Sequence, residues 1–270
     1  MISKGVDCEL LWYYQLTKTE ETPEDWGASN LIAMEVGSAI HDRMQRLFWD
    51  MDILEGVWQC KHCGYEFWAL SPKDRCFECL SPFKSFDSLR FKEVPMQTDM
   101  LRGHADGILN IDSVRYLLEL KSIKNVDREG ATYGFEKLGA NPIDEHFIQT
   151  QLYLSAWDYV VEKANNPEEL VVDDSGKLAV VKHEGPVYDG ARVIGKIENG
   201  LIEYIAKNNS QKKCYLIKKN ANSISFISEE MKKIWKAYLE GSIDNLIGVD
   251  YNSKGLCKKC KFRGVCTWSQ

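Results

Sequence analysis

Two cysteine pairs constrain the folding of this chain more than any other feature of its sequence. Each pair has the spacing C-x-x-C, and twelve residues separate the first pair from the second. A C-x-x-C turn directs two thiolates at one point, and two such turns supply the four ligands that zinc prefers in a closed structural site. Four unrelated buried cysteines would not share this symmetry. The spacing therefore predicts a structural zinc ion held by Cys60, Cys63, Cys76 and Cys79.

The residues around these cysteines favour a zinc ribbon inserted at positions 56–84. Gly64 follows the first pair, where the turn needs a permissive backbone. Pro72 and Pro82 interrupt regular periodicity, and we expect His62, inside the first pair, at the surface. Metal binding has to offset the ordering of a short segment. A small core could form from the flanking aromatic residues Trp58, Tyr65, Phe67, Trp68 and Phe77.

A second cysteine group lies near the C-terminus, where Cys257, Cys260 and Cys266 have the spacing C-x2-C-x5-C. Three thiolates lack a fourth ligand, and Cys8 and Cys214 are the remaining cysteines. A three-plus-one thiolate set suits zinc and an iron–sulfur cluster equally well, so the spacing does not choose between them. The run around Cys214 has the pattern of a strand, which favours a packed or exposed thiol at that position.

The composition is typical of one globular domain, residues 1–270, with an insertion. Of the 270 residues, 44% are hydrophobic and 27% are charged, which allows a buried core and excludes a disordered chain. No apolar run approaches the roughly 18 residues that a membrane span needs, and the first residues lack the apolar region of a secretion signal. We therefore expect no membrane partner and a cytoplasmic location. In such a reducing compartment, spaced cysteines bind metals more often than they form disulfides.

Charge is distributed unevenly along the chain, whose formal net charge is −6. Residues 201–270 carry 13 Lys and Arg against 6 Asp and Glu, a net +7, whereas residues 1–200 carry 21 against 34, a net −13. A basic C-terminal part can bind a polyanion even when the whole chain is acidic. A chance asymmetry of the solvated surface explains the same numbers.

Hydrophobic periodicity predicts an alternation of helices and strands. The predicted helices are 27–49, 145–163, 189–208 and 228–240. The predicted strands are 89–96, 100–111 and 114–120, with a turn at 110–113, and a hairpin with a polar turn at 171–181.

Residues suited to metal chemistry concentrate on two of the predicted strands. Gly103 and Asp106 lie on one strand, and Glu119 and Lys121 lie on the next, where period-two alternation directs both side chains to one face. Charges at the end of an apolar strand are costly to bury without partners, and a divalent cation between Asp106 and Glu119 would be such a partner. Lys121 could orient or deprotonate a water molecule and stabilise charge on a phosphorane. Alternatively, these charged residues form a salt bridge at an exposed strand end and bind no metal.

Two predicted helices add polar residues at helical spacing. Gly37 and His41 share one face of the first helix, four residues apart. Gln149 and Tyr153 lie one turn apart on the second helix, and His146 lies on the same stripe. A polar group on a core helix and a site residue are equally consistent with the position of His146.

The order of these motifs resembles the RecB-type branch of the PD-(D/E)xK nuclease superfamily. More narrowly, it resembles the iron–sulfur members: the CRISPR-associated exonuclease, its phage relatives and AddB-type nuclease domains. The resemblance spans nearly the whole chain and depends on the ordered set, which is Cys8, Gly37-x3-His41, Gly103-x2-Asp106, Glu119-x-Lys121, Gln149-x3-Tyr153 and Cys257-x2-Cys260-x5-Cys266. It implies an α/β fold with a restriction-endonuclease-like core, in which helices flank a small mixed sheet. The ribbon at 56–84 and the C-terminal segment 254–270, which would pair with Cys8, are added to this core.

The resemblance also implies a role for each matched residue of the nuclease core. His41, Asp106 and Glu119 would hold Mg²⁺ or Mn²⁺, with the Leu120 carbonyl as an additional ligand. Lys121 would be the catalytic lysine. These assignments follow the family pattern position by position.

The remaining matched residues would bind DNA or a cluster. Gln149 and Tyr153 would position the DNA strand and the catalytic lysine. Glu93 falls where relatives often carry a glutamate, so it is an accessory candidate, and His104, two residues before Asp106, is a candidate for supporting the site or contacting DNA. A [4Fe–4S] cluster would tie the chain ends together through Cys8, Cys257, Cys260 and Cys266.

The function that the resemblance implies is metal-dependent DNA hydrolysis in a bacterial, archaeal or phage-infected cell. We expect an exonuclease acting on single strands or duplex ends in recombination, repair or phage DNA processing, with a helicase, recombinase or CRISPR protein as partner. The chain itself has no G-x4-G-K-[ST] motif. The alternatives are a CRISPR-adaptation processing factor and a non-catalytic nucleic-acid-binding subunit, although the intact catalytic set argues against the latter. The ribbon lies outside the family pattern and would contact DNA, contact a partner protein, or cap the fold.

Overall fold

The computed structural model describes residues 8–22, 27–98, 101–123, 135, 138–172, 178–246, 248, 257 and 260–266. The chain divides into two compact units. The first comprises Met1–Ala33, Asp144–Gln149 and Asn220–Gln270, and the second comprises Met34–Ile143 and Thr150–Lys219. No helix in the described ranges combines the length and the apolar character that crossing a membrane requires.

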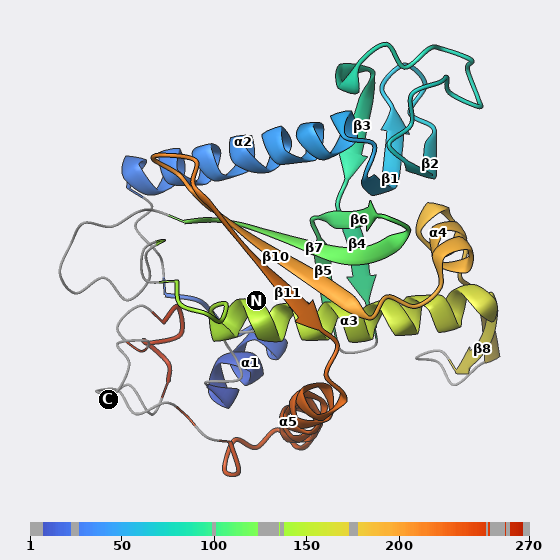
Figure 1. The fold of residues 1–270 in the computed structure, drawn as a ribbon. Helices are drawn as coiled ribbons and strands as arrows, with labels where there is room; N and C mark the ends of the chain where they lie inside the picture. Colours follow the sequence, from blue (N-terminus) through green and yellow to red (C-terminus); the bar gives the residue numbers. More distant parts are fainter. Residues whose placement is uncertain are drawn as a thin grey trace. The chain divides into compact units, whose positions relative to one another are not determined.

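The chain begins with two helices, continues through a run of strands that contains one short 3-10 helix, and then alternates single helices with pairs of strands (Figure 1). The helices are α1 (Glu9–Leu16), α2 (Ala28–Asp50), the 3-10 helix η2 (Phe86–Ser88), α3 (Asp144–Asn165), α4 (Pro186–Ile194) and α5 (Ala221–Glu240). The strands are β1 (Leu54–Cys60), β2 (Glu66–Leu70), β3 (Leu89–Lys92), β4 (Val94–Gln97), β5 (Arg102–Ala105), β6 (Gly107–Ile111), β7 (Val114–Ile123), β8 (Glu168–Val172), β9 (Leu178–Lys182), β10 (Asn199–Ala206) and β11 (Lys212–Lys218).

The second unit is built on a seven-stranded mixed sheet. Its strand order is β11-β10-β7-β6-β1-β2, and β3 also pairs with β1. The β7–β10 pair is parallel and the other pairs are antiparallel. A parallel pair needs a long crossover, and the connection between β7 and β10 contains α3. The mixed sheet, its flanking helices and the clustered cysteines confirm the α/β fold class predicted from the sequence.

Helices of the second unit pack on both faces of this sheet. Met44 of α2 belongs to the same buried core as Leu118 of β7. On the other face, Thr150 of α3 lies against Gly200 of β10, where an added Cβ would come within 2.4 Å of the threonine methyl group. Because side chains alternate along a strand, Glu119, which follows Leu118, points toward the α3 face.

The first unit brings together segments from both ends of the chain. Lys233 of α5 pairs with Glu9 of α1 at 2.7 Å. The ring centroids of Tyr14 and Phe262 lie 5.5 Å apart. The N-terminal helix and the C-terminal cysteine segment therefore pack within one unit.

The predicted helix at 189–208 is wrong, because this range contains the end of α4 and the strand β10. α4 ends at Ile194, and the next residue, Gly195, has a positive φ of 65° that suits a glycine C-cap. β10 is buried along nearly its whole length. Its apolar run therefore shows no alternation that would distinguish a strand from a helix.

The other predicted elements match the structure more closely. The helices predicted at 27–49 and 145–163 correspond to α2 and α3, and the hairpin at 171–181 corresponds to β8 and β9, with its turn outside the described residues. The helix predicted at 228–240 begins earlier, at Ala221, because the Asn220 side chain accepts backbone N–H groups of the first turn.

Candidate active site and metal centres

Two strand breaks place acidic residues beside each other. Glu93 lies between β3 and β4, and Asp106 lies between β5 and β6. The prediction that Asp106 shares a strand with Gly103 and His104 is therefore wrong. β5 pairs with β4, whereas β6 pairs with β7, so the chain changes sheets at Asp106. The backbone N–H of Asp106 still donates to the Leu118 carbonyl at 3.1 Å.

Asp106 is the centre of a cluster of metal-ligand side chains. Ligand atoms of His41, Glu93 and Asp106 lie within 4.8 Å of one another. The Nδ1 atom of His41 lies 3.0 Å from Oδ1 of Asp106, and Oδ2 accepts the backbone N–H of Leu120 at 2.6 Å. Gln45 donates to the Asp106 carbonyl at 3.3 Å. A proton on Nδ1 leaves Nε2 of His41 as the nitrogen that could bind a metal.

One carboxylate oxygen of Glu119 is buried without a hydrogen-bond partner among the described residues. Its side chain is almost fully buried, and Oε1 pairs with the Lys121 ammonium. The Oε2 atom is also buried and has no hydrogen-bond partner among the described residues. An unpartnered buried carboxylate oxygen is unfavourable, and carboxylate oxygens are preferred ligands of Mg²⁺. The ligand atoms of His41, Glu93 and Asp106 therefore fit a divalent cation, whereas Glu119 lies outside that group of ligand atoms within 4.8 Å of one another.

Burial and neighbouring charges shift the pKa values of the ionisable groups at this site. Burial raises the pKa of Glu119 to about 7, with Asp106 adding to the rise and Lys121 opposing it. Burial alone would lower the pKa of Lys121, but Glu119 outweighs it and raises that pKa. Burial would likewise lower the pKa of His41, and the bond to Asp106 raises it instead. Burial and the charge of Asp106 raise the pKa of Glu93.

Tyr153 reaches the site because Gly103 leaves room for it. A Cβ added at Gly103 would lie 2.5 Å from the Tyr153 hydroxyl. The charge of Tyr153 also contributes to the raised pKa of Lys121, which places the phenol near the ammonium group. Gln149 precedes Tyr153 by one turn of α3 and belongs to the first unit.

A cleft of about 520 Å³ opens beside the cluster. It is lined by Ser38, His41, Asp42, Gln45, Phe91, Lys92, Glu93 and His104. Glu93 and His104 are only secondary candidates from the sequence, and Gln45 is not predicted from it. The spacing of Gln45, one helical turn after His41, was the available signal.

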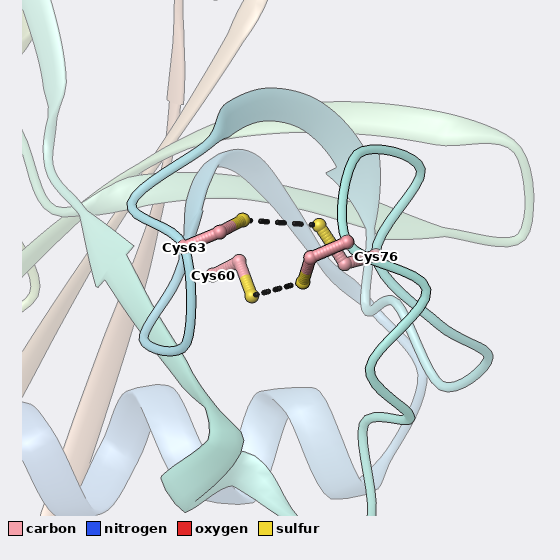
Figure 2. Close-up of side chains that lie close together, drawn as sticks. Cys60, Cys63 and Cys76 are labelled. Atoms are coloured by element: carbon pink, nitrogen blue, oxygen red, sulfur yellow. Dashed lines mark hydrogen bonds between the residues drawn. The ribbon is translucent and has the colours of Figure 1, made fainter.

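The four cysteines of the ribbon converge on one point (Figure 2). Cys60 and Cys79 have sulfurs 3.8 Å apart, and those of Cys63 and Cys76 are 3.6 Å apart. Zinc–sulfur bonds of about 2.3 Å in a tetrahedron give sulfur separations of about 3.8 Å. The cluster could therefore hold a metal ion, and its geometry fits zinc.

The thiols of this cluster differ in acidity. The side chain and backbone of Ser81 lower the pKa of Cys79 to about 6. Cys63 accepts a bond from the Tyr65 backbone that lowers its pKa, but burial and the other three thiols raise it to about 12. Binding a metal ion requires these thiols to lose their protons.

The cysteine cluster is continuous with the main sheet. β1 carries Cys60 at its end and pairs with β6 at its beginning, where Leu54 lies opposite Leu109. Cys60 and Cys76 are buried in the same core as Leu109. The ribbon therefore shares a strand and a core with the sheet that carries the candidate active site.

The terminal cysteines all belong to the first unit. Cys8 is the N-cap residue of α1. Burial raises the pKa of Cys260, and the charges of Cys8 and Cys266 raise it further, so these thiols are neighbours. Among the described residues, this set is not one of the two groups whose ligand atoms lie within 4.8 Å of one another. Cys214 lies exposed on β11, in the second unit.

Comparisons with known proteins add no assignment. No protein-family model and no curated protein matches the sequence. A solved structure described as "Crystal structure of SSO0001" matches over 100% of this chain and 86% of its own, at 12% sequence identity and a TM-score of 0.41. Similarity at this level assigns neither a family nor an activity.

Proposed function

We propose that this chain is a divalent-metal-dependent DNA nuclease of the RecB type. The observation that carries the proposal is the buried Glu119 carboxylate, whose Oε2 lacks a partner among the described residues while its other oxygen pairs with Lys121. A structural salt bridge alone would leave that oxygen unexplained. The neighbouring Asp106 and His41 are additional ligand candidates, in the order expected from the motif resemblance.

The residues of the site would divide the chemistry among them. His41, Asp106 and Glu119 would hold the metal, which would polarise the phosphodiester and stabilise the leaving oxygen when bound. Lys121 keeps a raised pKa beside Glu119, so it carries a positive charge at neutral pH. It would orient the attacking water and stabilise negative charge as the phosphate is attacked. Tyr153 would hold the lysine in place.

The activity is tested by incubating the protein with end-labelled single-stranded and duplex DNA. We expect shortened products with Mg²⁺ or Mn²⁺, and none with a chelator present. Intact DNA in every metal condition would contradict the nuclease proposal.

Cation binding should strengthen as the pH rises from 6 to 8. The raised pKa values of Glu119 and His41 mean that their protonated forms stabilise the metal-free fold at low pH. This contribution of Glu119 is complete below its unfolded pKa of about 4.3 and is lost as the pH rises through about 7. A metal ion must displace these protons. The increase in melting temperature caused by Mn²⁺ should therefore be larger at pH 8 than at pH 6.

Thermal unfolding with and without Mn²⁺ at both pH values measures this effect. In Glu119→Gln, which cannot ionise at this position, the increase caused by Mn²⁺ should be small at both pH values. Equal stabilisation of the wild type at pH 6 and pH 8 would show that Glu119 does not bind the ion.

We further propose that the terminal cysteines bind a [4Fe–4S] cluster and that the ribbon binds zinc. Cys8→Ala should remove the iron and the absorbance near 400 nm, an approximate position for thiolate-to-iron charge transfer. It should also promote aggregation, since the cluster would close a loop of roughly 250 residues and contribute on the order of a few kcal/mol. The matched control is Cys214→Ala, because Cys214 is exposed in the other unit.

Iron content and absorbance spectra of anaerobically purified protein check this prediction. A colourless protein that contains two zinc ions would show that the terminal cysteines bind a second zinc ion and not an iron–sulfur cluster. Loss of colour in Cys214→Ala but not in Cys8→Ala would show that the fourth ligand is wrong.

A further inference from the structure

The two C-x-x-C turns of the ribbon, residues 60–63 and 76–79, are called the knuckles. Apolar side chains in and next to the second knuckle are exposed and do not belong to the core of the ribbon. Phe77, between Cys76 and Cys79, is 76% exposed, and Leu80 is 63% exposed. The core of the ribbon is formed elsewhere, by Phe67 and Phe83, whose rings stack at 5.9 Å. Phe77 touches this stack only by an edge contact with Phe67. One face of the Phe77 ring is therefore available to a ligand.

Basic side chains with no ion pair accompany this exposed ring. Lys61 lies in the first knuckle and Arg75 immediately precedes the second; both are exposed and form no salt bridge within the part of the chain that the structure describes. Lys84 of the ribbon is exposed and likewise forms no salt bridge among the described residues, whereas Lys73 pairs with Asp52 and Lys92 pairs with Glu66. An acidic side chain, Glu78, is also exposed beside Phe77.

The ribbon is connected to the cleft by one strand. β3 begins with Leu89, which lies opposite Cys60, and its residues Phe91 and Lys92 line the cleft. Glu93, which follows β3, belongs to the candidate metal cluster. The four residue steps from Leu89 to Glu93 span about 13 Å in an extended strand. Single-strand-binding sites contact several nucleotides, so one bound strand is long enough to cover this distance.

We propose that the knuckles of the ribbon form a contact surface for single-stranded DNA, with Phe77 stacking on a base and Lys61 and Arg75 contacting phosphates. Exposed aromatic rings and unpaired cations together are the features that bind single strands without sequence preference. A protein partner with acidic side chains would account for the apolar side chains and the cations, but not for the strand that continues from the ribbon into the cleft. This inference rests on the proposed nuclease function, because the strand would lead from the ribbon to the active site.

The test measures DNA binding by the full-length, zinc-loaded protein without catalytic metal. A fluorescent thymidine oligonucleotide is titrated, and affinity is followed by fluorescence anisotropy. Phe77→Ala should weaken binding about tenfold. The matched control is Leu216→Ala, which removes an exposed apolar side chain from β11, at the opposite edge of the sheet. This control should bind as the wild type does.

Salt dependence and charge variants separate the roles of the residues. Lys61→Ala should reduce the slope of log affinity against log salt by about one, whereas Phe77→Ala should leave the slope unchanged. Glu78→Lys should bind more tightly than the wild type. Zinc content is measured for each variant, so that loss of the ribbon fold is recognised.

The outcomes distinguish this inference from the nuclease proposal. Wild-type affinity in Phe77→Ala with zinc retained would overturn the inference and direct attention to a protein partner, even if the protein cleaves DNA. Loss of affinity in a protein that never cleaves DNA would support the inference and reject the nuclease. Absence of DNA binding by the wild type would overturn the inference.

Discussion

Replacing Lys121 with alanine should reduce metal-dependent DNA cleavage by about 10²- to 10³-fold, the usual effect of removing a group that stabilises transition-state charge. Lys121 is the cation that pairs with Glu119 next to the metal-ligand cluster. Its raised pKa keeps it charged at neutral pH, since Glu119 outweighs the effect of burial. No other lysine is paired with a buried carboxylate at this cluster within the described residues.

The variant should remain folded, because Glu119 can take up a proton when its partner is removed. Its pKa is already raised to about 7 by burial, and the loss of Lys121 raises it further. Circular dichroism and a melting curve check the fold, and end-labelled DNA measures cleavage. Lys182→Ala is the matched control, because Lys182 is exposed on β9 and lies outside the candidate site. Undiminished cleavage by a folded Lys121→Ala protein would show that this site does not catalyse DNA cleavage.

The parts of the molecule that local spacing determines could be predicted from the sequence. Two C-x-x-C turns point their thiolates inward whatever surrounds them, so the cysteine cluster could be predicted before the fold. The same applies to the shared face of Glu119 and Lys121, which follows from strand alternation. The structure places the two side chains in contact.

Features that depend on distant pairing could not be predicted. The break at Asp106 exists because β5 and β6 pair with different strands. The Asp106-Gly107 dipeptide is a local signal for a break, but it does not show which strands the two halves pair with. Glu93 reaches the cluster for a similar reason, since it lies between a strand paired with β1 and a strand paired with β5. The strand β10 was predicted as helix because burial on both faces removes the period that separates the two.

Replacing Cys63 and Cys79 with serine should release zinc and destabilise the whole second unit, not only the ribbon. The ribbon shares β1 with the seven-stranded sheet, and Cys60 and Cys76 are buried in the core that contains Leu109 and Leu118. Structural zinc contributes about 10–16 kcal/mol to folding in zinc-finger peptides. Domains are stable by only about 5–15 kcal/mol in total. Losing the ion therefore removes an amount of free energy comparable to the full stability of the unit.

The expected result is a zinc-free protein that melts at a much lower temperature with a broad, non-cooperative transition. Iron content should be unchanged in the soluble fraction, because the terminal cysteines belong to the first unit. Elemental analysis and differential scanning calorimetry measure both effects, with Cys214→Ala as the control for loss of an exposed thiol. Zinc retained after both substitutions would show that the four cysteines are grouped wrongly. A zinc-free variant with an unchanged melting temperature would show that β1 does not couple the ribbon to the sheet. In that case β3, which pairs with β1 and leads from the ribbon to the cleft, would not couple the two sites energetically either.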